Sequence, residues 1–400
     1  MAERIDRVYR DAITSKLLPG VCIIAGDLEG NVVYSKSFGQ SSLRHGHEAP
    51  FTADTICAVA SMSKLMTAVS VLQCVQDGLL DLDKDIRHMI HGMGKHGIIT
   101  GFNDNETANV MPTSGAVTLR MLLSHTSGQE YDWMNPMLLQ WRSSRGEQPF
   151  SGPTVDDKCS IPLVFEPGSS FAYGAGYDWA GKVVEVATKG SLEDFMCVRI
   201  WTPLGIEKDT SFFPRTRDSL RGRMADFSTL DASGQPPAVD FSSYDMLSGT
   251  IECLGGGGIH TSTQGYYTFL SAVFRRDTRL LSSSSYDELF RPQLNEQCEE
   301  AFNSYIYLSQ AHMDFLALGI PRSVRKTWSF AGLVAKEPQN GRFGRGTLLW
   351  SGVPSVEWYM DYETGVCAVA MCQTLPPMHP RILGLHEQLQ RILFAERRGS

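Results

Sequence analysis

The stretch that decides the fold is Ala60-Ser61-Met62-Ser63-Lys64-Leu65. It opens an apolar run at helical spacing, which stops at Gly78 and consists of Met62, Leu65, Met66, Val69 and Leu72. Three residues are almost one helical turn, so Ser61 and Lys64 are expected to project from the same face. A lysine amine held in a dry environment loses part of its proton affinity and can deprotonate a neighbouring serine. The spacing therefore predicts a covalent serine catalyst that does not depend on a histidine base.

The same spacing occurs a second time, at Ser323-Val324-Arg325-Lys326. This copy follows Pro321, and residues 327–330 read as a strand. A proline and an alternating pattern both argue against a buried helix start. We therefore expect only the first copy to be catalytic.

The composition indicates a globular protein of one or two domains, because 400 residues with 42% hydrophobic content can bury a large core. A net charge of -8 gives no electrostatic case for nucleic acid or an anionic membrane. No apolar run reaches the roughly 18 residues of a membrane span, and residues 1–9 lack the apolar centre of a secretion signal. The nine cysteines are scattered without a CxxC pair, which favours reduced thiols and a cytoplasmic location.

Hairpin patterns occur near both ends of the chain, at residues 21–38 and 356–371. Helical patterns lie between and after them, at residues 62–77, 118–124, 178–188, 191–201 and 382–393. We expect an α/β (α+β) fold with one antiparallel sheet flanked by helices, a mostly α-helical second domain, and the active site in the cleft between them. Residues 1–80 and 245–400 are assigned to the domain with the sheet, and residues 81–244 to the helical domain.

Five further segments accompany the first serine–lysine pair, at residues 118–128, 166–179, 201–206, 254–259 and 349–353. In this order they resemble the superfamily of serine β-lactamases, penicillin-binding proteins and family VIII esterases, the fold of class C β-lactamases, over about residues 18–373. Within it the chain looks most similar to the fungal transesterases of the lovastatin diketide-transferase type. The supporting segments are residues 60–65, 72–74, 81–83, 173–175 and 178–182.

The resemblance implies a role for each matching residue. Ser61 would be the nucleophile, Lys64 its proton-shuttling neighbour, and Tyr173 the general acid/base. The backbone N–H groups of Ser61 and Val353 would form the oxyanion hole. Because a tyrosine of ordinary pKa would stay protonated, we expect Lys64 to lower the pKa of Tyr173.

Two departures from the penicillin-recognising members concern the substrate. Trp350 and Ser351 stand where Lys and Thr usually hold a drug carboxylate, and Gly352 is expected to let the substrate approach the backbone. Ala175 stands where the family's second motif, which begins here at Tyr173, usually ends in Asn. These changes favour an apolar ester or acyl group, for which Tyr131 and Trp133 are candidate wall residues. Ordinary core packing explains those two aromatic residues equally well.

Other candidate features have plainer explanations. His125 lies in a turn that is structural in the resembling family. His88, His91 and His96 lack acidic partners at ligand spacing, so no metal is expected. The glycines at 255–258 are not a phosphate loop, since no Gly-Lys-Ser/Thr follows, and we expect them to form a tight strand entry into the active-site wall. A solvated surface or a docking site for an acidic acyl carrier protein would explain Arg215, Arg217, Arg221 and Arg223.

We therefore predict a serine acyltransferase without cofactors. It would move an acyl group from an ester or thioester, on coenzyme A or a carrier protein, to an alcohol of a small natural product. With water as acceptor the same groups would make an esterase, which is the alternative function. A non-catalytic binding or scaffold protein is the third hypothesis, and the intact Ser61, Lys64 and Tyr173 count against it.

Overall fold

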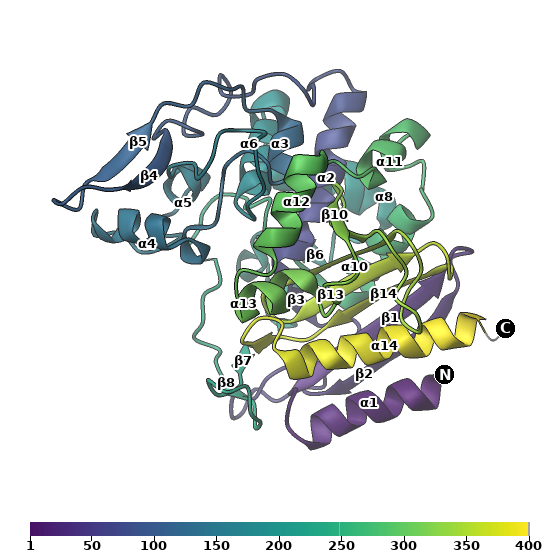
Figure 1. Cartoon of the computed structure of the whole chain (residues 1–400). Coiled ribbons are helices and arrows are strands. Elements are labelled where there is room, and N and C mark those ends of the chain that lie inside the picture. The colour runs from purple at the N-terminus through teal and green to yellow at the C-terminus, as the bar shows by residue number, and fades with distance from the viewer. Residues whose placement is uncertain (248, 399–400) are drawn as a thin grey trace.

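The computed structural model describes residues 1–247 and 249–398 (Figure 1). Its centre is a seven-stranded antiparallel sheet with the order β10-β11-β12-β13-β14-β1-β2. The strands are β1 (Gly20–Asp27), β2 (Val32–Gly39), β10 (Lys326–Trp328), β11 (Leu333–Ala335), β12 (Thr347–Gly352), β13 (Val356–Asp361) and β14 (Val366–Met371). Both predicted hairpins are present, and β1 pairs with β14. The expectation of one antiparallel sheet built from distant parts of the chain is confirmed.

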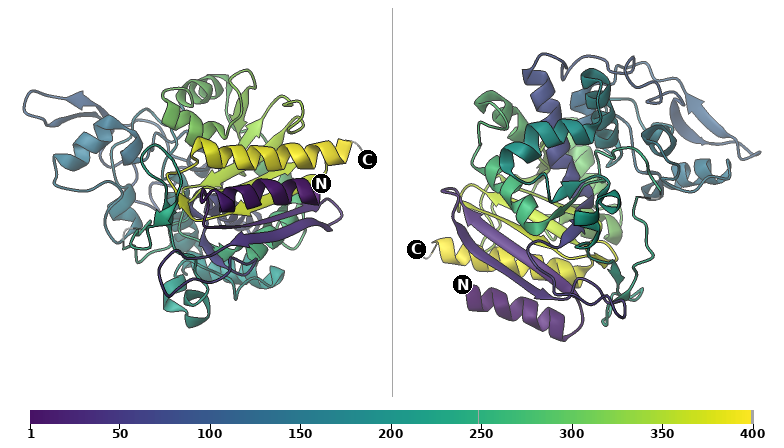
Figure 2. Two further views of the ribbon diagram at one scale, coloured as in Figure 1. Left: turned by 90° about the horizontal axis from the view of Figure 1, so that it is seen from below. Right: turned by 180° about the vertical axis from the view of Figure 1, so that it is seen from behind.

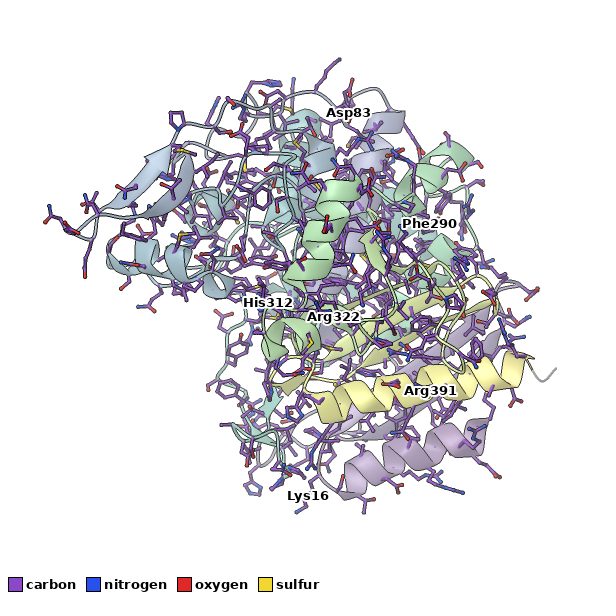
Figure 3. All side chains as sticks on the ribbon, in the orientation of Figure 1. Lys16, Asp83, Phe290, His312, Arg322 and Arg391 are labelled. Carbon is purple, nitrogen blue, oxygen red and sulfur yellow. The ribbon has the colours of Figure 1, made fainter. Side chains whose placement is uncertain are left out.

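Helices cover both faces of this sheet. The terminal helices α1 (Ala2–Thr14) and α14 (Pro380–Arg398) lie side by side on the outer face (Figures 1 and 2). Lys16, which follows α1, and Arg391 of α14 mark this side in Figure 3. The helix α10 (Thr263–Phe274) packs on β1 and β14 from the inner side. Every residue of β1, β13 and β14 is buried, as the double cover requires.

The helix that follows the first serine–lysine pair is α2 (Ser63–Gln76), and it packs against α6 (Gly176–Thr188). The helices α3 (Leu119–Leu123), α5 (Val155–Cys159) and α7 (Leu192–Met196) contact α6, and α11 (Ser283–Phe290) contacts α2. The structure also contains α4 (Pro136–Ser143), α8 (Thr202–Leu204), α9 (Asp218–Arg221), α12 (Glu296–Tyr305) and α13 (Gln310–His312). The predicted helices at 62–77, 118–124 and 178–188 are confirmed, with ends that differ by one or two residues. The fourth prediction, 191–201, is α7 continued by a π-helical segment, Cys197–Trp201.

Short strands complete the structure. They are β3 (Ile56–Ala58), β4 (Ile98–Phe102), β5 (Ala108–Met111), β6 (Thr210–Ser211), β7 (Ser228–Thr229), β8 (Val239–Asp240), β9 (His260–Ser262) and β15 (Thr374–Leu375). The strand expected at 327–330 is β10, which begins at Lys326, the last residue of the second serine–lysine copy, and ends at Trp328. All strands of the large sheet fall within residues 1–80 and 245–400, whereas the boundaries of the two domains stay a prediction. Across residues 1–247 and 249–398, no helix has both the length and the apolar character that spanning a membrane requires.

Candidate active site

Ser61 lies in a tight turn between β3 and α2. The strand β3 ends at Ala58, a single 3₁₀ turn covers Ala60–Met62, and α2 begins at Ser63. Ala60 has φ +44°, a left-handed conformation that is strained for any residue with a side chain. The chain therefore bends sharply just before Ser61, whose side chain is almost entirely buried.

The three groups expected to form the catalytic centre meet at the Ser61 hydroxyl. The Lys64 ammonium nitrogen lies 3.0 Å from Ser61 Oγ. The Tyr173 hydroxyl donates a hydrogen bond to the same oxygen over 2.8 Å. Lys64 arrives from the first turn of α2, and Tyr173 from the loop that precedes α6. Ser61 and Tyr173, which meet at this hydrogen bond, are 112 positions apart in the chain.

Lys64 is enclosed on all sides. Its Nζ donates to the carbonyl of Gly256 over 2.7 Å and contacts the Tyr131 hydroxyl at 3.3 Å. Burial lowers the pKa of Lys64 to about 7, and the nearby Asp178 carboxylate acts in the opposite direction without restoring the ordinary value. A substantial fraction of Lys64 is therefore an uncharged amine at neutral pH, which is the form able to accept a proton.

The turn of four glycines at 255–258 forms the wall beside Lys64. Gly256 receives the Lys64 hydrogen bond on its carbonyl and donates its N–H to Asp178 Oδ1 over 2.9 Å. A Cβ at position 256 would lie 2.4 Å from Asp178 Oδ2, so only glycine allows this approach. The Thr67 hydroxyl of α2 bonds the carbonyl of Gly255 over 2.7 Å. The turn thereby joins α2 to α6.

The expectation that the pKa of Tyr173 is lowered is wrong, because the pKa is raised. The phenol is fully buried against the rings of His125 and Trp350, with centroids at 4.6 and 5.2 Å. Burial raises the pKa of Tyr173 well above its usual range, and the hydrogen bond with Ser61 lowers it by less. Tyr173 is therefore a neutral phenol at rest, ready to donate a proton rather than to remove one.

His125 supports the loop that carries Tyr173. Its Nδ1 accepts the N–H of Gly174 over 3.3 Å, and its carbonyl accepts the N–H of Ala172 over 3.1 Å. Burial holds the pKa of His125 well below its usual value, so the ring is neutral. These contacts agree with the structural role expected for this histidine.

Trp350, Ser351 and Gly352, which match the third motif of the resembling family, lie at the end of β12. Trp350 is buried edge-on against Trp328, with ring centroids 4.6 Å apart. Ser351 is buried within the strand, and a Cβ on Gly352 would lie 2.4 Å from the carbonyl oxygen of Val59. Gly352 therefore admits the segment that leads into Ser61, while its predicted accommodation of substrate stays a prediction. Val353 follows directly in the sequence, and its proposed place in the oxyanion hole stays a prediction.

Tyr131 and Trp133 form an aromatic surface that leads away from Lys64. Their rings stack at 4.2 Å with an interplanar angle of 18°. Phe150 contacts both edge-on, at 5.7 and 5.1 Å. Tyr131 is 5% exposed and Trp133 is 43% exposed, so the surface connects the buried amine with solvent. A substrate could lie along it, and this role stays a prediction.

Carboxylates of the same chain neutralise most of the arginine cluster, which consists of Arg215, Arg217, Arg221 and Arg223. Salt bridges join Arg217 to Glu193, Arg221 to Asp218 and Arg223 to Asp209. These contacts favour the solvated-surface explanation. Among the described residues, no three His, Cys, Asp or Glu side chains gather as a metal site would require.

Asp178 received no role from the sequence, and Gly256 was expected only as part of a glycine run in the active-site wall. Asp178 follows Tyr173 by five positions and stands at the start of α6, where its carboxylate reaches the Lys64 environment. Gly256 supplies the carbonyl that holds Lys64. The run of four glycines was the available signal for a close backbone approach, but nothing local indicated its partner.

The fold and the site together define a class. A serine hydroxyl shared by a lysine amine and a tyrosine phenol, beside an antiparallel sheet covered by helices, is the arrangement of a serine acyl-transfer enzyme. A model of the family described as Beta-lactamase matches residues 5–391, and the chain belongs to this family.

Its similar relatives include fungal acyltransferases and an esterase. The chain is 32% identical to the lovastatin esterase of Penicillium rubens, with 94% of this chain and 93% of the relative covered. It is 31% identical to the monacolin J acid methylbutanoyltransferase of Aspergillus terreus, covering 98% and 95%. The solved structure of unliganded simvastatin synthase from Aspergillus terreus matches with a TM-score of 0.89 at 30% identity, covering 99% and 98%.

Proposed function

We propose that this chain is a serine acyltransferase that moves an acyl group from a thioester or ester to an alcohol of a small natural product. The observation that carries the proposal is the Ser61 hydroxyl, which lies within hydrogen-bonding distance of both Lys64 and Tyr173. The fungal relatives support the acyl-transfer chemistry, since one of them is a methylbutanoyltransferase acting on monacolin J acid.

In the first half-reaction Ser61 attacks the acyl carbonyl. Uncharged Lys64 takes the hydroxyl proton as the new C–O bond forms. The backbone N–H groups of Ser61 and Val353 would hold the oxyanion of the tetrahedral intermediate. Tyr173 donates its proton to the departing thiolate or alkoxide and recovers one from Lys64. The products are an ester on Ser61 and the free thiol or alcohol.

In the second half-reaction an acceptor alcohol attacks the ester on Ser61. Its proton passes to the Lys64–Tyr173 pair while its oxygen bonds to the acyl carbon. The same pair returns a proton to Ser61 Oγ when the acyl–serine bond breaks. The enzyme thus ends in its starting protonation state, and the aromatic surface of Tyr131 and Trp133 is the proposed site for the acceptor.

The substrate is proposed to be apolar rather than a penicillin. Trp350 occupies the place of the usual lysine and is buried between Tyr173 and Trp328. An indole there offers no positive charge for a carboxylate. Ala175 likewise lacks the amide that would bind an acylamino group.

Hydrolysis is the second candidate, favoured by the similarity to the lovastatin esterase. Water and an alcohol would use the same proton path, so the outcome depends on whether a bound acceptor excludes water. The donor would be a thioester of coenzyme A or of a carrier protein. Because Arg217, Arg221 and Arg223 are paired with carboxylates of the same chain, a carrier protein would dock elsewhere. The nine unpaired cysteines support a reducing compartment such as the cytoplasm.

The test is to incubate the protein with a methylbutanoyl thioester, with and without monacolin J acid, and to follow ester and free acid by mass spectrometry. Separate incubation with lovastatin measures hydrolysis. Ser61→Ala is expected to abolish the acyl-enzyme and both products, whereas Ser323→Ala, at the exposed serine of the second copy, keeps them. Full turnover by Ser61→Ala would end the proposal. Free acid as the sole product, even with acceptor alcohols present, would establish the esterase instead.

A further inference from the structure

The turn that carries Ser61 is held in place by the side chain of Gln373. This residue lies 315 positions after its hydrogen-bond partner, Ala58. The Gln373 side chain reaches Ala58, the last residue of β3. Its Oε1 accepts the N–H of Ala58 over 3.0 Å, and its Nε2 donates to the carbonyl of Ala58 over 3.1 Å. One amide thus satisfies both backbone groups of one residue.

The topology explains why this contact is needed. The strand β3 lies at the edge of the three-stranded sheet β3-β9-β6. Val59 bonds to Ile259 on the β9 side, so the N–H and carbonyl of Ala58 point the other way. There the Gln373 amide takes the place of a neighbouring strand. Buried backbone groups left without such a partner would be costly.

The backbone of Gln373 and of the next residue is itself hydrogen-bonded to two other segments. Its carbonyl accepts the N–H of Ser228 over 2.8 Å. The carbonyl of the next residue, Thr374, accepts the Ser355 hydroxyl over 2.9 Å, and the Thr374 N–H donates to the carbonyl of Pro354 over 3.1 Å. Pro354 and Ser355 belong to the turn between β12 and β13, which begins with Val353. Gln373 and Thr374 therefore hold the two backbone segments that would supply the oxyanion hole, one leading to Ser61 and the other following Val353.

We infer that Gln373 is a positioning residue, whose amide keeps the strained Ala60 turn in the conformation that aims the hydroxyl and N–H of Ser61. It touches no reacting group in the structure and acts through Ala58. The strain at Ala60, with φ +44°, gives the turn a reason to relax once the amide is lost. This inference rests on the proposed function, because it assigns Gln373 to the Ser61 chemistry.

Replacement by leucine tests the inference. Gln373→Leu keeps the side-chain size but removes both bonds to Ala58. We expect kcat for acyl transfer to fall at least about tenfold with KM changed less than about threefold, since a small displacement of a nucleophile costs rate more than binding. The matched control is Gln73→Leu, which removes another buried amide that bonds two backbone carbonyls, those of Arg199 and Leu280. It should reduce thermal stability without changing kcat per folded enzyme.

Replacement by glutamate adds a readout that general destabilisation would not produce. In Gln373→Glu, the protonated carboxyl group can still offer one acceptor and one donor to Ala58, although it lacks the second amide donor that bonds the carbonyl of Cys372. The ionised carboxylate cannot donate to the carbonyl of Ala58. The rate of this variant relative to the native enzyme should therefore fall as the pH rises. A ratio independent of pH, together with native kcat in Gln373→Leu, would overturn the inference. Loss of activity in Ser61→Ala with native kcat in Gln373→Leu would reject the role of Gln373 alone, and activity in Ser61→Ala would reject the proposed function.

Discussion

At the scale of single residues, the site divides its proton chemistry between two buried groups. Burial moves the pKa of Lys64 down to about 7 and the pKa of Tyr173 up, because each environment disfavours the charged form. The amine is thereby made a usable base, and the phenol a poor one but an intact donor. This assignment leads to a definite dependence on pH.

Activity should fall as the pH drops below about 7, because Lys64 must lose its proton before it can accept that of Ser61. A plot of kcat/KM against pH is expected to decline about tenfold per unit on the acidic side. Lys64→Arg places a permanent cation there and should lower kcat/KM by roughly 10²–10⁴-fold above pH 7, with a smaller difference from the native enzyme at acidic pH. The surface variant Lys84→Arg is the control, since Lys84 is 80% exposed. A rate that stays constant through the acidic range would contradict the role of Lys64 as base.

The sequence could predict those residues whose relation is local. Ser61 and Lys64 are three positions apart on a helix, and this spacing alone places them together. Tyr173 was found through the motif around it. Gln373 and Asp178 could not be found in this way, because their roles depend on contacts with Ala58 and Lys64 in remote segments. The sign of the Tyr173 shift was missed because burial, which decides it, is a property of the folded chain.

At the scale of elements, the glycine turn at 255–258 sets the distance between α2 and α6. Thr67 and Lys64 of α2 bond its carbonyls, while Asp178 of α6 accepts its N–H. The long helices were predictable from their periodicity. Strands such as β3 and β9 were not, because three residues show no clear alternation and are defined by their pairing.

Gly256→Ala should damage this junction. Its new Cβ would lie 2.4 Å from Asp178 Oδ2, so the turn, Asp178 or both must move, at a cost of about 1–3 kcal/mol in unfolding free energy. The carbonyl that holds Lys64 would move with it, and we expect kcat to fall as well. Gly190→Ala is the matched control, because nothing lies within 4 Å of its Cβ position. Urea unfolding and kcat for both variants provide the measurement, and equal behaviour of the two would contradict a close-packed junction.

At the scale of the whole molecule, the two ends of the chain meet in one sheet. Residues of β1 pair with those of β14 from Cys22 opposite Met371 to Asp27 opposite Val366. Paired hairpin patterns made this closure predictable. The position of β10 and β11 at the edge of the sheet opposite β2 could not be predicted, since only the observed strand order shows which strands lie next to them.

This closed core accounts for the expected behaviour of the cysteines. All nine are unpaired, and Cys197 is partly exposed while the other eight are buried. We therefore expect about one thiol to react rapidly with a chromogenic disulfide reagent in the native protein, and nine after unfolding in denaturant without reductant. Burial also raises the pKa of thiols such as Cys57 and Cys159, which further slows their reaction because the thiolate is the nucleophile. Fewer than nine reactive thiols in denaturant would reveal a disulfide. Rapid reaction of several thiols in the native state would show that the sheet and its helical covers open far more readily than their complete burial implies.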